Sequence, residues 1–352
     1  MRDNATNLLL SWYDAHKRDL PWRDVSDPYQ TWVSEIMLQQ TRVETVMRYF
    51  PRFIAAFPDV HALAAAPLDA VLKLWEGLGY YSRARNLHRG AQEVVEQFGG
   101  ALPSDPALLR KISGVGEYTA GAIASIAFGV RTPAVDGNVI RVISRLQGLR
   151  ENVQIPSVRR AIAKAAGELV PADRPGDFNQ AMMDLGATVC VPGTPDCALC
   201  PLQSLCDAFA EGDADELPVL PVRTPPKELH YDVLIVCSGN RVLMRRRTEA
   251  MLHGLWVYPM LERCSSDDET AGRAAALLKL PLTDVQSTGE AKHVFTHQVW
   301  HMRLWTANAP ADSPAPHGYA FHTLEAMHAL TIPTAMAAAK KAAEAVLENY
   351  EL

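Results

Sequence analysis

The sequence lacks the features that mark membrane, secreted or fibrous proteins. No apolar run approaches the about eighteen residues that a membrane-spanning helix needs. The N-terminal stretch MRDNATNLLLSWYDAHKR carries acidic residues and no small-residue cleavage site, so it is not a secretory signal. Internal repeats, low-complexity segments, coiled-coil patterns and long apolar helix faces are also missing. We therefore expect a cytoplasmic protein that does not contact membranes and is a monomer.

An excess of positive charge is missing too, because the net charge is −6. That value alone argues against a nucleic-acid partner, but affinity for nucleic acid depends on where the basic residues sit. Residues 73–89 (KLWEGLGYYSRARNLHR) contain Glu76 as their one acid, together with the basic residues Lys73, Arg83, Arg85 and Arg89. With Tyr80 and Tyr81 beside them, these residues could grip phosphates and wedge into a base stack. A solvated helix face is the alternative.

A chain of 352 residues is long enough for two domains with separate cores. Residues 1–211 show short amphipathic segments separated by Pro, Gly and Asp, which predicts a helical region. Residues 212–228 are rich in acids and prolines and form a predicted linker. Residues 229–352 contain segments typical of strands, at 231–237, 242–246 and 293–306, and end in a helix at 335–347.

The stretch 112–138 (ISGVGEYTAGAIASIAFGVRTPAVDGN) joins two helix-like segments through Gly114-Val-Gly116 and ends on an acid, Asp136. Upstream, Ser104 or Asp105 can cap a helix that has Pro106 at its first position. Both glycines permit positive φ, and the amides after Gly116 would form an anion site at a helix N-terminus. A plain tight turn remains the alternative.

Six cysteines are present, and four of them lie close together in the sequence as Cys190, Cys197, Cys200 and Cys206. In a reducing compartment these residues are more typical of metal binding than of disulfides. Zinc sites usually contain two closely spaced pairs, whereas here only Cys197 and Cys200 form one. Four thiolates on a short irregular loop favour a [4Fe–4S] cluster that organises the loop, with zinc as the alternative.

The hairpin, the acid in Val135-Asp-Gly-Asn138 and the cysteine spacing together resemble the helix-hairpin-helix DNA glycosylases with an iron–sulfur loop. The branch of that superfamily with lyase activity carries a lysine nucleophile after the hairpin turn, where this sequence has Tyr118. A phenol cannot form a Schiff base. The sequence is therefore identified as a member of the other branch, the MutY-type adenine DNA glycosylases, which remove undamaged adenine paired with 8-oxoguanine.

The resemblance implies a pair of carboxylates with different tasks. Glu35, mid-helix near Trp32 and Leu38, would have a raised pKa and protonate the adenine, and Asp136 would stay ionised beside the cationic sugar. Asn138 and Tyr118 would orient these groups and the attacking water. The alternatives to these catalytic roles are an exposed helix glutamate in an ion pair for Glu35 and a turn-forming aspartate for Asp136.

Further roles follow from the same resemblance. The pocket for the flipped adenine would be formed by Arg18, Leu20, Trp22 and Gln180, although Leu20 and Trp22 could equally be core residues. DNA contacts are expected from Arg23, Gln40, Tyr80, Arg83, Arg85, Gly114 and Gly116. Among these, Gln40 and Tyr80 would be the wedges that replace the extruded base.

Residues 229–352 resemble the Nudix-like domain of the same family, so the expected fold is a mainly α region followed by an α+β domain. The Arg-Glu-x-x-Glu-Glu run of Nudix hydrolases is missing, which argues against phosphohydrolase activity. The domain would instead recognise 8-oxoguanine through Phe295, Thr296 and His297, where many relatives have serine in the middle. A hairpin turn without a ligand is the alternative.

The expected partner is double-stranded DNA with 8-oxoguanine:A or G:A mispairs. Two other functions stay open at this point. An oxidised-pyrimidine glycosylase with lyase activity is disfavoured by Tyr118, and a non-catalytic iron–sulfur DNA-binding or redox protein is disfavoured by the presence of both Glu35 and Asp136.

Overall fold

The computed structural model describes residues 2–23, 25, 27–222 and 224–350. The chain forms two compact units: unit 1 contains Met1–Ala66 and Ser82–Val222, and unit 2 contains Pro67–Tyr81 and Arg223–Leu352. Among the described residues, no helix combines the length and the apolar character needed to cross a bilayer.

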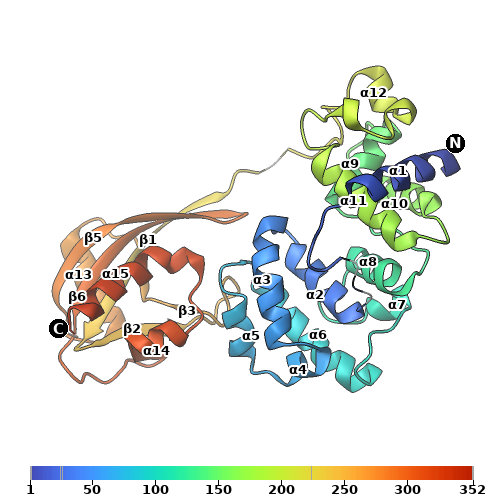
Figure 1. Ribbon diagram of the computed structural model, residues 1–352. Helices are drawn as coiled ribbons and strands as arrows, with labels where there is room; N and C mark the ends of the chain where they lie inside the picture. The colour runs from blue at the N-terminus through green and yellow to red at the C-terminus, as the bar shows by residue number, and fades with distance from the viewer. Residues whose placement is uncertain (1, 24, 26, 223, 351–352) are drawn as a thin grey trace. The chain divides into compact units, whose positions relative to one another are not determined.

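Unit 1 is helical (Figure 1). Its α-helices are α1 (Arg2–His16), α2 (Pro28–Leu38), α3 (Val43–Ala56), α4 (Val60–Ala65), α6 (Ser82–Phe98), α7 (Pro106–Leu109), α8 (Glu117–Phe128), α9 (Gly137–Leu146), α10 (Pro156–Leu169), α11 (Pro175–Thr188) and α12 (Asp207–Glu211). One core cluster contains Leu9, Ile143, Ile162 and Leu185, which come from α1, α9, α10 and α11. The helices α2 and α11 both pack against α8.

Local sequence explains the helices that carry the site. Asp27 caps α2 by accepting a hydrogen bond from the backbone N–H of Tyr29 at 2.9 Å, and Pro28 occupies the first turn. Asp105 caps α7 in the same way, as predicted, with the N–H of Ala107 at 2.8 Å. The helix α8 is apolar nearly all round, which is typical of a helix buried on most faces.

Unit 2 is built on a seven-stranded sheet with the strand order β3-β2-β1-β6-β5, to which β4 adds at β1 and β7 at β2. The strands are β1 (Lys227–Ser238), β2 (Arg241–Arg246), β3 (Trp256–Val257), β4 (Met260–Glu262), β5 (Thr283–Val294), β6 (Gln298–Asn308) and β7 (Tyr319–Thr323). The β1 and β6 pair is parallel, and the other pairs are antiparallel.

Helices cover both faces of this sheet. One core cluster joins Val233 and Val242 of the sheet to Ala343 of α15 (Ala337–Glu348) and Met327 of α14 (Leu324–Ala329). A second cluster joins Leu234 to Leu278 of α13 (Asp267–Leu278). The remaining α-helix of unit 2 is α5 (Leu68–Leu74), which comes from the middle of the helical part of the sequence.

The structure differs from the sequence predictions in three places. Residues 67–81 belong to unit 2, and residues 212–222 to unit 1, where the carbonyls of Leu217 and Val219 accept hydrogen bonds from Arg145 and Val153. The predicted strand 293–306 is interrupted by a turn, because β5 ends at Val294 and β6, which contains residues 298–306, begins at Gln298. The run of β-branched and aromatic residues continues across this turn, so the sequence pattern does not indicate where the first strand ends.

Candidate active site

Glu35 lies in the middle of α2 with 5 % of its surface exposed. Burial is the largest cause that raises its pKa to about 7, and the negative charge of Asp136 acts in the same direction. The hydrogen bond from Tyr118 and the positive charge of Arg23 act against this rise. The expectation of an elevated pKa therefore agrees with the structure, and an exposed helix glutamate does not. A carboxyl with such a pKa can donate a proton at neutral pH.

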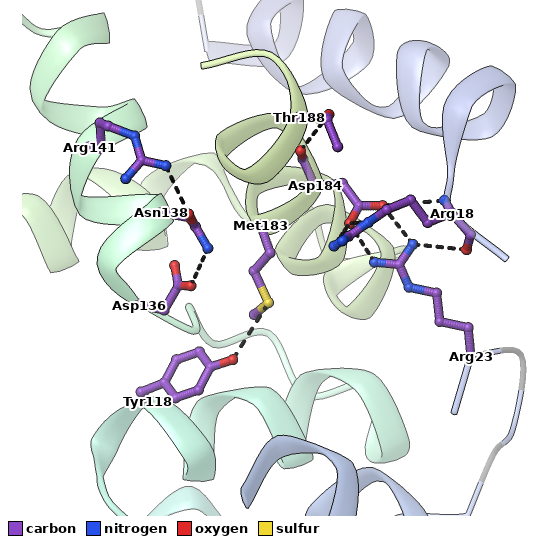
Figure 2. A network of polar contacts seen from close by, with 9 residues as sticks. All are labelled: Arg18, Arg23, Tyr118, Asp136, Asn138, Arg141, Met183, Asp184 and Thr188. Carbon is purple, nitrogen blue, oxygen red and sulfur yellow. Dashed lines mark hydrogen bonds and ion pairs between the residues drawn. The ribbon is translucent and has the colours of Figure 1, made fainter. Parts of the chain in front are cut away.

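Tyr118, in the first turn of α8, reaches this carboxyl directly. Its phenol donates a hydrogen bond to Oε2 of Glu35. Its oxygen also lies 3.6 Å from Sδ of Met183 on α11, as Figure 2 shows. Burial raises the pKa of Tyr118 well above its usual value, and the neighbouring carboxylates contribute. The side chain therefore remains a neutral phenol and a hydrogen-bond donor.

Asp136 is the N-cap of α9. Its Oδ1 accepts a hydrogen bond from the N–H of Val139 at 2.8 Å, and its Oδ2 accepts one from Nδ2 of Asn138 at 2.8 Å. Burial raises the pKa of Asp136 above its ordinary value, and these hydrogen bonds and the charge of Arg141 offset only part of the rise. The carboxylate thus has a structural role as a helix cap in addition to its place beside Glu35.

A chain of hydrogen bonds connects Asp136 to the cysteine loop, and Figure 2 shows its part from Asp136 through Asn138 to Arg141. Nη2 of Arg141 donates to Oδ1 of Asn138 at 2.8 Å, and Nε of Arg141 donates to the carbonyl of Cys190 at 2.7 Å. Gly186 allows α11 to approach, because a Cβ there would lie 2.5 Å from Cβ of Asn138. The amide of Asn138 is therefore fixed from both sides.

The residues predicted to receive adenine line one cavity together with Glu35. Its lining includes Arg18, Leu20, Trp22 and Gln180. Leu20 and Trp22 are also buried, and the Trp22 ring meets Phe50 edge to face at 5.5 Å. The two interpretations of Leu20 and Trp22, core and pocket wall, are therefore compatible.

The hairpin between α7 and α8 uses its two glycines differently. Gly114 has φ +81°, and a Cβ there would lie 2.9 Å from Cβ of Asn86. Gly116 has φ −85° and is the N-cap of α8, so only Gly114 needs the left-handed region that was expected for both. Apart from its two chain neighbours, nothing lies within 4 Å of the position a Cβ would take at Gly116, which leaves the backbone open to a ligand.

The proposed wedges share an unusual backbone. Gln40, exposed just after α2, has φ +55°, and Tyr80, in unit 2, has φ +47° with 47 % of its surface exposed. Residues other than glycine adopt this region in only a few per cent of cases, in turns and helix caps as well as at functional positions.

The four predicted cysteine ligands line one cavity with Arg145. Arg145 is 2 % exposed and donates from Nη1 to Sγ of Cys190 at 3.3 Å and to the carbonyl of Val191 at 2.8 Å. Within the described ranges, no three His, Cys, Asp or Glu side chains are placed to hold one metal ion. A buried cation beside these sulfurs is suited to a site that carries negative charge.

In unit 2, Phe295, Thr296 and His297 form the turn between β5 and β6. The N–H of Phe295 donates to the carbonyl of Gln298 at 2.8 Å, and its ring meets Trp300 edge to face at 4.9 Å. Thr296 and His297 are exposed, and Oγ1 of Thr296 lies 2.6 Å from the phenol oxygen of Tyr80. The turn therefore exposes the hydroxyl of Thr296 and the imidazole of His297 next to the packed rings of Phe295 and Trp300.

Comparison with known proteins identifies the family. Residues 33–168 match the HhH-GPD superfamily of base excision DNA repair proteins, and residues 232–342 match the NUDIX domain. The adenine DNA glycosylase of Mus musculus is 38% identical over 93% of this chain and 75% of its own length, and that of Homo sapiens is 36% identical over 93% and 72%. The chain belongs to the adenine DNA glycosylases.

The solved structures agree on the fold of this glycosylase. A thermostable thymine-DNA glycosylase is 29% identical, with a TM-score of 0.55, and covers 60% of this chain and 97% of its own. The prediction of a helical hairpin-containing region followed by an α+β, Nudix-like domain is confirmed. The protein is a base-excision DNA glycosylase, and its substrate is DNA.

Two arginines of the glycosylase do not fit the predicted role in contacting DNA. The side chain of Arg23 is 7 % exposed and donates from Nη1 to Oδ2 of Asp184 at 2.6 Å (Figure 2). Arg83 is 8 % exposed and donates to the carbonyls of Ile36 and Met37 at 3.0 and 2.8 Å. Arg23 neutralises a buried acid and Arg83 caps the end of α2, so both guanidinium groups are bound within the protein and not presented to a phosphate. Arg85 is half-buried, and its predicted role stays a prediction.

Sequence reasoning missed Asp184, which organises the pocket. This carboxylate on α11 is 1 % exposed, and it accepts hydrogen bonds from Nε of Arg18 at 2.8 Å and from Arg23. The two guanidinium groups hold the pKa of Asp184 below its ordinary value despite burial. The signal available in the sequence was an acidic residue between apolar residues in AMMDLG. The sequence alone does not reveal which distant residues pair with this acid.

Proposed function

We propose that this glycosylase removes undamaged adenine mispaired with 8-oxoguanine, and also adenine from G:A mispairs, by hydrolysis without a lyase step. The observation that carries the proposal is the buried Glu35, with a pKa of about 7, close to Asp136 and hydrogen-bonded by Tyr118. An adenine leaves poorly as an anion, so its departure needs a proton donor that is still protonated at neutral pH.

In the proposed reaction Glu35 protonates N7 of the flipped adenine. The bond between N9 and C1′ of the sugar then breaks, and its electron pair stays with the neutral base. The ionised Asp136 stabilises the cationic sugar, and water adds to C1′ while its proton passes to a carboxylate of the pair. Asn138 would hold the Asp136 carboxylate in place through its 2.8 Å hydrogen bond.

The absence of a lyase step rests on Tyr118. A lyase needs an amine that forms a Schiff base with the sugar, and this position carries a phenol whose pKa is raised by burial. The phenol supports a different task, which is to orient the Glu35 carboxyl by its hydrogen bond.

Access to the base would require extrusion from the duplex. Gln40 and Tyr80 are the proposed wedges, and the exposure of both side chains supports this role. The open backbone at Gly116 and the amides of α8 would bind a phosphate next to the target, and Gly114 shapes the turn. Arg18, Leu20, Trp22 and Gln180 would surround the adenine.

We further propose that Cys190, Cys197, Cys200 and Cys206 hold a [4Fe–4S] cluster that orders their loop. Support comes from the shared cavity and from the buried Arg145 beside Cys190. A single zinc ion would require all sulfurs about 2.3 Å from one point, whereas a cluster binds each thiolate to a different iron. Visible absorption and iron content of the purified protein test this, and a colourless, iron-free but active protein would refute it.

The turn Phe295–His297 would recognise 8-oxoguanine. The exposed hydroxyl of Thr296 and imidazole of His297 provide donors and acceptors, and Phe295 is fixed by Trp300. Removal of residues 229–352 should lower the preference for 8-oxoguanine:A over G:A.

A gel assay on defined duplexes tests the proposed function as a whole. With 8-oxoguanine:A, strand breaks should appear only after alkali, because hydrolysis leaves an abasic site. Breaks without alkali on an oxidised pyrimidine would indicate a lyase instead. No breaks on any duplex would indicate a protein that binds DNA without catalysis.

A further inference from the structure

Residues 67–81 fold as part of unit 2, although residues of unit 1 flank them in the sequence. This segment consists of α5 and the turn that carries the wedge Tyr80. The turn and the lesion-recognition hairpin therefore belong to the same compact unit. Polar contacts at two places fasten the segment to the rest of unit 2.

At the first place, the carboxylate of Glu76 and the ammonium group of Lys73 form hydrogen bonds with one stretch of backbone, residues 330–332. Oε1 of Glu76 accepts a hydrogen bond from the N–H of Ile332 at 3.0 Å, and Oε2 accepts one from Nζ of Lys73 at 2.6 Å. The same Nζ donates to the carbonyl of Leu330 at 2.9 Å. We call these two side chains the clamp.

The backbone that the clamp grips is itself rigidly held. Ile332 is 4 % exposed and belongs to the core cluster under the sheet. The carbonyl of Thr331 accepts a hydrogen bond from the N–H of Trp256 in β3 at 3.0 Å. The clamp thus connects the end of α5 to the sheet, and not to a surface loop.

The second fastening is at the wedge. Nε1 of the buried Trp75 donates to the carbonyl of Gly79 at 3.1 Å, which closes the turn. Tyr80 follows with φ +47°, and its phenol lies 2.6 Å from Oγ1 of Thr296. A left-handed non-glycine residue persists only where its surroundings hold it. The clamp and Thr296 hold this turn from its two ends.

We propose that Glu76 and Lys73 are positioning residues for lesion discrimination, which fasten the wedge turn so that Tyr80 and Thr296 meet the base opposite adenine as one element. This inference rests on the proposed function. The side chains of Lys73 and Glu76 are 35 % and 25 % exposed, so each contact contributes less than in a dry interior. Their effect lies in orientation, since neither side chain takes part in the chemistry.

The test is single-turnover excision from 8-oxoguanine:A and G:A duplexes. Glu76→Ala and Lys73→Met should each lower the ratio of the two rates by about three- to tenfold, through the 8-oxoguanine:A rate. Glu76→Gln should recover part of the ratio, because its amide oxygen can still accept from Ile332. The matched control is Glu344→Ala, whose partners His328 and Lys340 lie on α14 and α15, and it should keep the wild-type ratio.

A double-mutant cycle separates positioning from general loosening. If the clamp acts through the wedge, Glu76→Ala should lower the ratio much less in a Thr296→Val background than in the wild type. Equal loss on both duplexes, or full additivity with Thr296→Val, would overturn the proposal. An unchanged ratio in Glu76→Ala and Lys73→Met would overturn the clamp and leave the proposed function in place. A wild-type protein without preference for 8-oxoguanine:A would instead overturn the proposed lesion recognition, and the clamp with it.

Discussion

In unit 1 the polar groups that act together are largely buried, whereas in unit 2 they stand on an exposed hairpin turn. Glu35 is 5 % exposed and Asp184 is 1 % exposed, and each is bound by groups from other elements. Thr296 and His297 are exposed, and Thr296 has its contact with Tyr80. Burial shifts the pKa values of ionisable groups, and it destabilises the fold unless each polar group has a partner. A buried side chain also cannot contact a DNA base.

The difference teaches which property each task requires. Proton transfer to adenine requires a carboxyl held neutral, and exclusion from water achieves that for Glu35. Reading a base requires donors and acceptors that can reach it, and a hairpin turn provides them. Substitutions in unit 1 should therefore have large effects on rate and stability, and substitutions in the recognition turn should have small effects confined to discrimination.

The largest effect is expected from Glu35→Gln. Loss of a general acid should slow single-turnover excision from 8-oxoguanine:A by about 10²–10⁴-fold, because glutamine fills the same space but donates no proton to N7. Duplex affinity should change little, and so should the unfolding midpoint at pH 4, where Glu35 is protonated in the folded and largely in the unfolded protein. Excision within tenfold of the wild type would remove Glu35 from the mechanism.

Asp184→Asn should cause the largest loss of stability. It leaves Arg18 and Arg23 facing each other without a counter-charge, so the free energy of unfolding should fall by about 3 kcal/mol. Urea denaturation measures this change. The matched control is Asp14→Asn, whose carboxylate pairs with Arg174 at the surface and should affect stability little. Equal effects of the two variants would contradict the contrast between buried and exposed charges.

The pH dependence of stability sharpens the same contrast. The pKa of Glu35 is raised from 4.5 to about 7 in the folded protein, so the folded state retains a proton that the unfolded chain has lost. The contribution of Glu35 to stability is therefore present below pH 4.5 and is lost as the pH rises through 7. Relative to the wild type, the stability of Glu35→Gln should rise by about 3 kcal/mol between pH 4 and pH 8. Urea midpoints of both proteins at these pH values measure it, and a difference independent of pH would refute the buried carboxyl.

The smallest effect is expected from Thr296→Val. Loss of one exposed hydroxyl should lower the ratio of excision rates for 8-oxoguanine:A and G:A by about three- to tenfold and leave the melting temperature unchanged. Thr296→Ser retains the hydroxyl and should retain the ratio. If Thr296→Val lowered both rates and the stability, the hairpin would be part of the core and not a recognition turn.

The sequence was sufficient where a residue acts through its immediate neighbours. The cap at Asp105, the hairpin glycines and the apolar surroundings of Glu35 are local, and the predictions for Asp105 and for the pKa of Glu35 agree with the structure. A resemblance in a few motifs also identified the family and the order of its two domains.

The predictions that failed depend on distant packing. Arg23 was expected to contact DNA from the family resemblance and Arg83 also from the basic stretch 73–89, yet Arg23 neutralises Asp184, far along the chain, and Arg83 caps α2. The place of residues 67–81 in unit 2 depends on contacts with residues 330–332. Such pairings are set by the tertiary fold and leave no periodic signal.

The central claim is that Glu35 acts as a buried acid with an elevated pKa, and the pH dependence of excision tests it most directly. Single-turnover rates on an 8-oxoguanine:A duplex should be higher at pH 6 than at pH 8 and should fall as the pH rises past about 7, where Glu35 loses its proton. The small residual rate of Glu35→Gln should lack this fall. A wild-type rate that is constant from pH 5 to 9, or that falls near pH 4.5 as for an exposed glutamate, would contradict the account.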